Sequence, residues 1–197
     1  MNNRFLLTQS LLSSRNWVFK SESGYEDFIR TLKRERTPPT KAMLDGIKFE
    51  NLVAAYLDGA PLDEGHEWCK GITEVADILK NGVLQVKLSK RITIDGVEFV
   101  LYGILDALKA GVVYDTKFSK TYKYGKYLDS PQHPMYLELC PEASEFTYII
   151  SNGKDVYMET YSRQDTPPIK DEIQLFMKYL DEHGLTDLYC ANWRSQY

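Results

Sequence analysis

The stretch Val97–Phe118, VEFVLYGILDALKAGVVYDTKF, decides the fold. It contains two apolar runs, Val97–Leu105 and Val112–Phe118, separated by Ala110-Gly111. Both runs are rich in β-branched and aromatic residues, which favour strands, and glycine after a short polar break favours a turn. We therefore predict two neighbouring strands joined by a tight turn.

The sequence before this stretch predicts a third strand. Leu84, Val86 and Leu88 alternate with polar residues, and the alternation resumes towards Val97. This period of two is typical of a strand with one buried face. Asp95-Gly96 is a strong signal for a hairpin turn. The three strands are therefore expected to form a meander.

Helices are predicted before the meander in the sequence. The best helical pattern runs from Ala42 to a stop at Gly59, and its apolar residues recur at helical spacing. These residues are Met43, Ile47, Phe49, Leu52, Val53 and Tyr56. Residues 4–36 look helical but broken, with Thr8 or Ser10 as a cap and a second helix over Gly24–Arg34. The segment Thr37-Pro38-Pro39-Thr40 interrupts this pattern.

The second half of the chain adds two helices and a hairpin. Ser130-Pro131 is expected to start a helix, with the serine as cap and the proline in the first turn. Phe146–Ile150 and Val156–Tyr161 flank a Ser-Asn-Gly-Lys turn and predict a hairpin. Pro167-Pro168 is expected to open a last helix, Ile169–His183, which Gly184 closes.

This order predicts an α/β fold of the mixed α+β kind. The chain has 197 residues, which favours one domain over 1–197. Within it we expect an N-terminal helical extension (1–41), a core (42–165) and a C-terminal helix and tail (166–197). Because 43% of the residues are hydrophobic, the composition excludes a disordered chain.

Composition also bears on location. The longest apolar runs are short, so no transmembrane helix is expected, and the first residues lack the apolar core of a signal peptide. Three scattered cysteines, Cys69, Cys140 and Cys190, are interpreted as small buried or half-buried hydrophobes in a reducing compartment. We therefore expect a cytoplasmic protein.

Charge is unevenly distributed along the chain, although the net charge is only −4. Arg30–Lys41 and Lys109–Tyr127 each carry five basic residues against one acid, whereas residues 141–187 are acidic. Such a molecule can bind a polyanion on one side. The alternative is that both stretches are solvated faces.

Three charged residues stand where burial is expected to be high. Asp106 follows the strand that ends at Leu105, and Asp115 and Lys117 lie two apart on the next strand, hence on one face. Two carboxylates held together repel unless a cation lies between them. Hard oxygen ligands suit magnesium or manganese rather than zinc. The alternative is a surface ion pair on a solvated strand.

Three further features favour a site. Gly103 permits a close approach to its strand, and Gln132 and Tyr136 lie on one face of the following helix. Glu50 directly follows Phe49, where an acid beside the buried stripe needs a partner. For Gln132 and Tyr136, a packing role is the alternative.

The ordered set of these residues resembles a known family. Gly103-Ile104-Leu105-Asp106, then Asp115-Thr116-Lys117, then Gln132-x-x-x-Tyr136 is similar to the PD-(D/E)XK nuclease superfamily, and more narrowly to its RecB-like and phage lambda-type exonuclease branch. Gly46–Glu50 matches the upstream acidic helix. The resemblance spans Ala42 to Tyr136 and implies a restriction-endonuclease-like core, a central mixed sheet flanked by helices. The four cysteines of some relatives are missing, so no iron–sulfur cluster is implied, and His66 is not assigned a role.

The resemblance also implies roles for individual residues. Asp106, Asp115 and the carbonyl of Thr116 would hold Mg²⁺, for which Mn²⁺ could substitute, and Glu50 would complete the metal site. Lys117 would orient water or stabilise the phosphate charge, with Gln132 and Tyr136 positioning it or contacting DNA. The segment after this strand would guide DNA by charge and stacking. Its residues are Lys120, Lys123, Lys126 and Tyr124.

The resulting hypothesis is a metal-dependent DNA nuclease, a phage or prophage exonuclease of recombination or DNA processing in the cytoplasm of a bacterium or infected host. DNA is the expected partner, with a single-strand annealing protein or a helicase and a homo-oligomer as further expectations and no membrane. The alternatives are an endonuclease of the same superfamily, a non-catalytic DNA-binding or scaffold protein on the same fold, and an unrelated domain in which the motif is chance.

Overall fold

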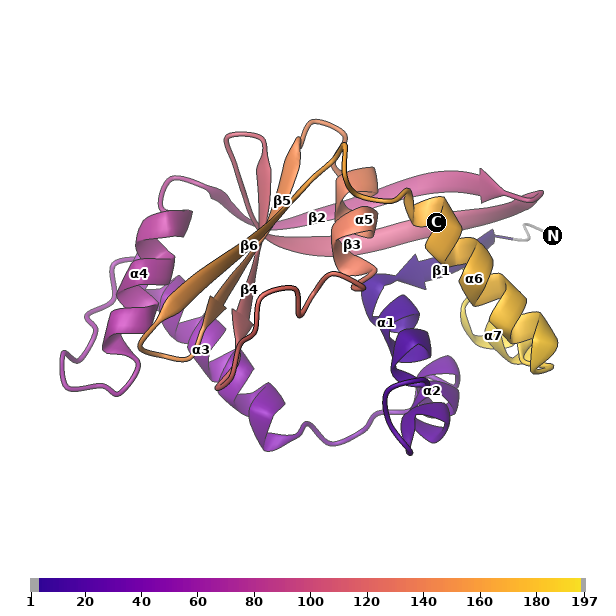
Figure 1. The fold of residues 1–197 in the computed structure, drawn as a ribbon, viewed down its shortest axis with the longest axis horizontal. Coiled ribbons are helices and arrows are strands. Elements are labelled where there is room, and N and C mark those ends of the chain that lie inside the picture. The colour runs from indigo at the N-terminus through magenta and orange to yellow at the C-terminus, as the bar shows by residue number, and fades with distance from the viewer. Residues whose placement is uncertain (1–3, 196–197) are drawn as a thin grey trace.

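A computed structural model describes residues 4–195. It consists of one six-stranded mixed sheet with helices on both faces (Figure 1). The prediction of a mixed α+β fold with a central mixed sheet flanked by helices is confirmed. The strands are β1 (Arg4–Thr8), β2 (Val83–Ile94), β3 (Val97–Lys109), β4 (Val112–Phe118), β5 (Glu145–Ser151) and β6 (Val156–Ser162). The helices are α1 (Gln9–Trp17), α2 (Gly24–Leu32), α3 (Lys41–Leu57), α4 (Cys69–Leu79), α5 (Gln132–Leu139), α6 (Ile169–Glu182) and α7 (Thr186–Asn192).

The long strand β3 organises the sheet. β2 pairs antiparallel with β3 along one edge, and both predicted hairpins of the meander form. The other edge of β3 is shared: β1 pairs in parallel with Glu98–Tyr102, and β4 pairs antiparallel with Ala107–Lys109. β4 then continues in parallel with β5, which pairs antiparallel with β6. Between Tyr102 and Ala107, no described strand pairs with this edge of β3, and a fork opens there.

The two turns of the meander have the backbone that their residues favour. Asp95 and Gly96 have φ of 50° and 80°, and Ala110 and Gly111 have φ of 50° and 78°. Positive φ at both central residues is typical of the tight turns that match the twist of a hairpin. The Asp-Gly and Ala-Gly pairs therefore fix the register of β2, β3 and β4.

The N-terminal helical extension predicted over 1–41 contains the helices α1 and α2, but a strand precedes them. Arg4–Thr8 forms a strand of the central sheet, with Phe5 and Leu7 buried on one face. Its parallel partner β3 lies about ninety residues later in the chain, and no local pattern announces such a pairing. Thr8 ends this strand and caps α1, since its hydroxyl accepts from the amide of Leu11 at 3.3 Å. Residues 1–3 lie outside the described residues.

Two helices were missed, and the starts of α3 and α5 were each misplaced by one residue, since α3 begins at Lys41 rather than Ala42. α4 and α7 were not predicted, although Ile72, Val75 and Leu79 recur at helical spacing on the buried side of α4. α5 begins at Gln132, with Pro131 rather than Ser130 at the cap position. The Ser130 hydroxyl still accepts from the amide of Gln132 at 3.3 Å, so the serine serves the first turn from one position further out.

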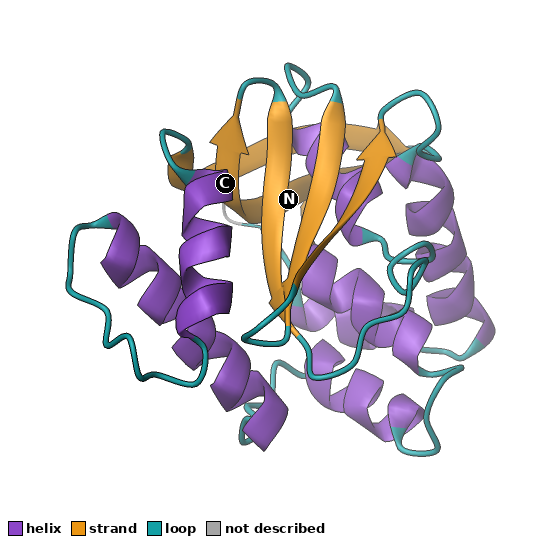
Figure 2. Cartoon of the chain, turned by 60° about the vertical axis from the view of Figure 1, so that its left-hand side comes forward, coloured by secondary structure: helices purple, strands orange, loops and turns teal. Residues whose placement is uncertain are grey.

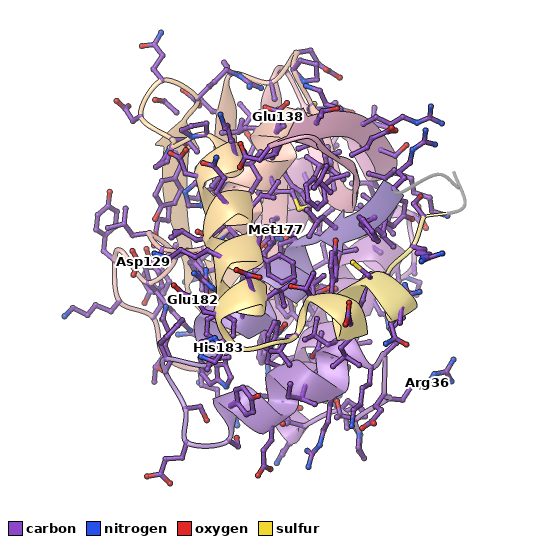
Figure 3. All side chains as sticks on the ribbon, turned by 90° about the vertical axis from the view of Figure 1, so that its right-hand side faces the viewer. Arg36, Asp129, Glu138, Met177, Glu182 and His183 are labelled. Atoms are coloured by element: carbon purple, nitrogen blue, oxygen red, sulfur yellow. The ribbon has the colours of Figure 1, made fainter. Side chains whose placement is uncertain are left out.

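Each face of the sheet has its own apolar core. α3 and α4 cover one face, where Phe49 and Val53 pack with Trp68 and Ile72 (Figures 1 and 2). The larger core lies on the opposite face, under α1, α2, α5, α6 and α7. Figure 3 looks onto α6 and shows Glu182 and His183 at its C-terminal end. None of the helices between residues 4 and 195 has the length and apolar character that crossing a bilayer requires.

Part of the predicted apolar stripe of α3 is exposed. Phe49 and Val53 are buried, but Met43 and Ile47 have more than half of their surface exposed. The N-terminal half of α3 extends beyond the sheet edge (Figure 1), so it has no core to cover. The burial predicted for the cysteines is confirmed, because Cys140 is buried and Cys69 and Cys190 are half-buried.

Candidate active site

The fork between β3 and β4 carries the first acid of the predicted site. β4 pairs with β5 along its whole length but with β3 only as far as Tyr114, so the amide of Thr116 has no backbone partner on β3. The Asp106 carboxylate takes this place and accepts the Thr116 N–H at 2.8 Å. The side chain of Asp106 therefore bridges the two strands where their backbones separate.

Asp115 and Lys117 meet on β4, as their spacing predicts. The two side chains form an ion pair, with Asp115 Oδ2 2.7 Å from Lys117 Nζ. Gln132 of α5, itself buried, donates from Nε2 to Asp115 Oδ1. Asp115 Oδ2 is buried, and its partner is the Lys117 ammonium. Gln132 thus holds one oxygen of Asp115 and Lys117 holds the other.

Glu50 reaches the same place from α3. Phe49 fixes the rotation of this helix by packing on Trp68 and Phe118, with ring centroids 6.1 Å and 4.9 Å away. Glu50, next in the chain, then lines a cavity of about 60 Å³ together with Asp106 and Thr116. Much of the Glu50 side chain is exposed, unlike that of Asp115. Glu50 is therefore the outermost acid of the cluster.

The charges of these groups act on one another. Burial and then the charge of Asp115 raise the pKa of Asp106 to about 7. Burial also raises the pKa of Glu50, against the opposing effect of Lys117. Burial lowers the pKa of Lys117, but the charges of Asp115 and Asp106 outweigh it, so the pKa of the ammonium lies above its usual range. The site thus holds a protonated Lys117 together with two acids, Asp106 and Glu50, whose raised pKa disfavours their ionisation.

Tyr136 has a packing role against the site. An ideal Cβ at Gly103 would lie 2.5 Å from Tyr136 Cε1 and 3.0 Å from Leu139 Cδ1. The close approach expected at Gly103 is therefore made by the ring of Tyr136, which is buried. Burial, then the charge of Asp115, raises the pKa of Tyr136 to about 12, so its phenol stays protonated at neutral pH.

Gly103→Ala is expected to lower the free energy of unfolding by about 1–3 kcal/mol, because the new methyl group overpacks the contact with Tyr136. The displaced α5 would also move Gln132 away from Asp115. Gly46→Ala is the matched control: nothing lies within 4 Å of its Cβ position on α3, so this variant is expected to be about 0.5–1 kcal/mol more stable than the wild type. Urea unfolding of both variants measures the difference, and equal effects would contradict the packing role.

Sequence reasoning missed one residue of the site. Gln85 lies on β2 opposite Asp106 and lines the same cavity as Glu50 and Asp106. Its φ of 51° is unusual for a non-glycine residue within a strand. The alternating pattern of β2 contains no signal for this conformation. His66, which was assigned no role, accepts the amide of Trp68 on Nδ1 at 3.1 Å.

The predicted DNA-binding residues lie on the segment Ser119–Pro131, which we call the basic loop. Lys120 and Lys123 are exposed, and 78% of the surface of Tyr124 is exposed. Lys126 instead turns back and donates from Nζ to the Ser119 hydroxyl at 2.9 Å. The far end of the loop, around Asp129, lines a pocket together with Pro168 and Asp171 at the start of α6.

The acids do not form a closed metal cage. Between residues 4 and 195, no group of three or more His, Cys, Asp and Glu side chains is arranged to hold a metal ion. Mg²⁺, however, usually takes one or two carboxylates and keeps several waters. Asp106, Asp115 and the Thr116 carbonyl are hard oxygen donors of this kind, and they lie together at the fork of β3 and β4. This smaller set fits Mg²⁺ or Mn²⁺, with Glu50 outside it.

Comparisons with known proteins concern the fold. No protein family matches the sequence, and no curated protein is similar to it. A solved structure described as the crystal structure of SSO0001 is 12% identical, covers 90% of this chain and 76% of its own, and has a TM-score of 0.55. A structure of LHK-Exo in complex with dAMP is 15% identical, covers 90% of this chain and 88% of its own, and has a TM-score of 0.47. The likeness to SSO0001 shows that its fold is shared over most of this chain.

Proposed function

We propose that this protein is a metal-dependent nuclease that hydrolyses phosphodiester bonds in DNA, acting as an exonuclease as its sequence resemblance implies. The observation that carries the proposal is the convergence of Asp106, Asp115 and Lys117 at the fork of β3 and β4. Asp106 and Asp115 lie in a largely buried place beside one lysine, and this excess of negative charge is costly unless a cation offsets it. The excess of acid supports a cation site.

Each residue of the cluster has a part in hydrolysis. Mg²⁺ bound by Asp106, Asp115 and the Thr116 carbonyl would relieve phosphate charge and acidify water. Lys117 stays protonated and faces the same point, so it stabilises the charge that develops on the phosphate. Gln132 holds the Asp115 carboxylate from behind, and this fixes the orientation of its other oxygen.

A cleft beside the cluster supports a polyanionic substrate. It has a volume of about 270 Å³ and lies between the start of α3 and the end of β4. Lys41 and Lys120 line it together with Asp45 and with Phe118, the residue after Lys117. The two basic stretches of the sequence thus meet at one cleft. Phosphate groups are the natural partners of such lysines.

The test is incubation of the protein with end-labelled linear and circular duplex DNA, with Mg²⁺, with Mn²⁺ and with a chelator. We expect linear DNA to be degraded with either metal, no degradation with the chelator, and circular DNA to stay intact. Cleavage of circular DNA would replace the exonuclease by an endonuclease. DNA binding without cleavage would favour a non-catalytic protein, and neither binding nor cleavage would overturn the proposal.

A further inference from the structure

Glu159 is a buried acid outside the cluster of Asp106 and Asp115. It lies on β6 with 1% of its surface exposed. Its Oε2 accepts from the Tyr122 hydroxyl at 2.7 Å and from the amide of Gly125 at 3.2 Å. Its Oε1 accepts from the amide of Tyr127 at 3.3 Å and from the Tyr161 hydroxyl. Three of these four donors belong to the basic loop.

The basic loop supplies most of the hydrogen bonds that this buried carboxylate accepts. A buried charge is tolerated only when it is paired or hydrogen-bonded, and among residues 4–195 no cation forms an ion pair with Glu159. The loop donors therefore replace water around the carboxylate. If the loop lifted away, Glu159 would lose most of its partners, so the carboxylate holds the loop against β6.

Aromatic contacts support the same anchor. The ring of Tyr127 stacks on Tyr148 at 4.5 Å, and the ring of Tyr122 lies 5.1 Å from Tyr157. The phenol of Tyr127 is close enough to Lys117 for the two groups to shift each other's pKa. The inner side of the loop thus runs from Glu159 to the edge of the site.

The outer side of the loop is left free to bind. Tyr124 lies directly between Lys123 and Gly125, and Gly125 donates to Glu159. Because Tyr122 and Gly125, on either side of the tip, both donate to Glu159, the exposed ring of Tyr124 is held out from the loop, which also exposes Lys120 and Lys123. A fixed aromatic ring with lysines around it is suited to stacking with a base of a single strand.

We propose that Glu159 is a positioning residue, which holds the basic loop in the conformation that presents Tyr124, Lys120 and Lys123 to single-stranded DNA. The inference rests on the proposed function. Glu159 touches no reacting atom, so its loss is expected to weaken substrate binding and to leave the chemistry at Asp115 and Lys117 largely unchanged.

Two single-atom variants separate the anchor from general stability. Tyr122→Phe and Tyr161→Phe each remove one hydroxyl that donates to Glu159, but only Tyr122 belongs to the loop. For Tyr122→Phe we expect a rise in KM of about tenfold for a labelled single-stranded oligonucleotide, with kcat within about twofold. Tyr161→Phe is expected to leave KM unchanged. Glu159→Gln is expected to raise KM more than Tyr122→Phe does. Circular dichroism of this variant must show that it is folded.

Trypsin digestion reports on the loop without any assumption about activity. Lys120, Lys123 and Lys126 are cleavage sites that a fixed loop protects, so faster cleavage there is expected in Tyr122→Phe and not in Tyr161→Phe. Equal cleavage and equal KM in the two variants would overturn the role of Glu159. If the wild type neither binds nor cleaves DNA, the proposed function fails. In that case, different trypsin patterns of Tyr122→Phe and Tyr161→Phe would still support the role of Glu159 in holding the loop. Equal patterns would contradict that role.

Discussion

Lys117→Ala is expected to lower the rate of metal-dependent DNA hydrolysis by about 10²–10³-fold or more. Lys117 Nζ is the only cation in contact with the buried Asp115 carboxylate within the described chain, and it faces the point where phosphate charge would develop. No neighbouring lysine can replace it, since Lys120 and Lys123 lie on the exposed side of the basic loop. Initial rates on end-labelled linear DNA with Mg²⁺ measure the loss.

Lys170→Ala on α6 is the matched control, because it removes an exposed lysine remote from the fork, and we expect full activity from it. Lys117→Ala also leaves Asp115 without its cation, so urea unfolding of the variant must show that it is folded. Lys117→Met, which keeps the aliphatic stem, serves if alanine destabilises the protein. Retention of more than a tenth of the wild-type rate by a folded Lys117 variant would contradict the proposed role.

Local patterns account for the part of the site that was predicted. Asp115 and Lys117 meet because residues two apart on a strand share a face, whatever surrounds them. Asp95-Gly96 sets the hairpin register for a similar reason, since positive φ is a property of those two residues. Such features depend only on neighbours in the chain, so the sequence contains them in full.

Features that depend on distant packing could not be predicted in this way. The strand Arg4–Thr8 exists because β3 offers it an edge, and its own sequence is equally compatible with a helix. The exposure of Met43 and Ile47 depends on how far α3 extends past the sheet. An acid on an edge strand such as Glu159 usually faces water, and only the position of the basic loop buries it.

The second large effect is expected at Asp106, where Asp106→Asn should strongly lower the rate of DNA hydrolysis and stabilise the metal-free protein. The asparagine side chain keeps an oxygen that can accept the Thr116 amide, but it removes a charge from beside Asp115. With one carboxylate lost from the donor set, we expect DNA hydrolysis to fall by about 10²–10³-fold. Asp181→Asn, at an exposed site near the end of α6, is expected to change neither property.

The stability gain at Asp106 has a defined pH dependence. The pKa of Asp106 is about 7 in the folded protein and 3.8 as its ordinary value, so the folded state binds the proton more tightly than the unfolded state. Ionisation of Asp106 therefore costs stability as the pH rises from about 4 to 7. In chelator at pH 8, the free energy of unfolding of Asp106→Asn is expected to exceed that of the wild type by on the order of 2 kcal/mol. At pH 4 the two proteins are expected to have the same free energy of unfolding. Urea unfolding at both pH values measures this difference. An equal difference at pH 4 and pH 8 would contradict a pKa of Asp106 raised by burial and by the charge of Asp115.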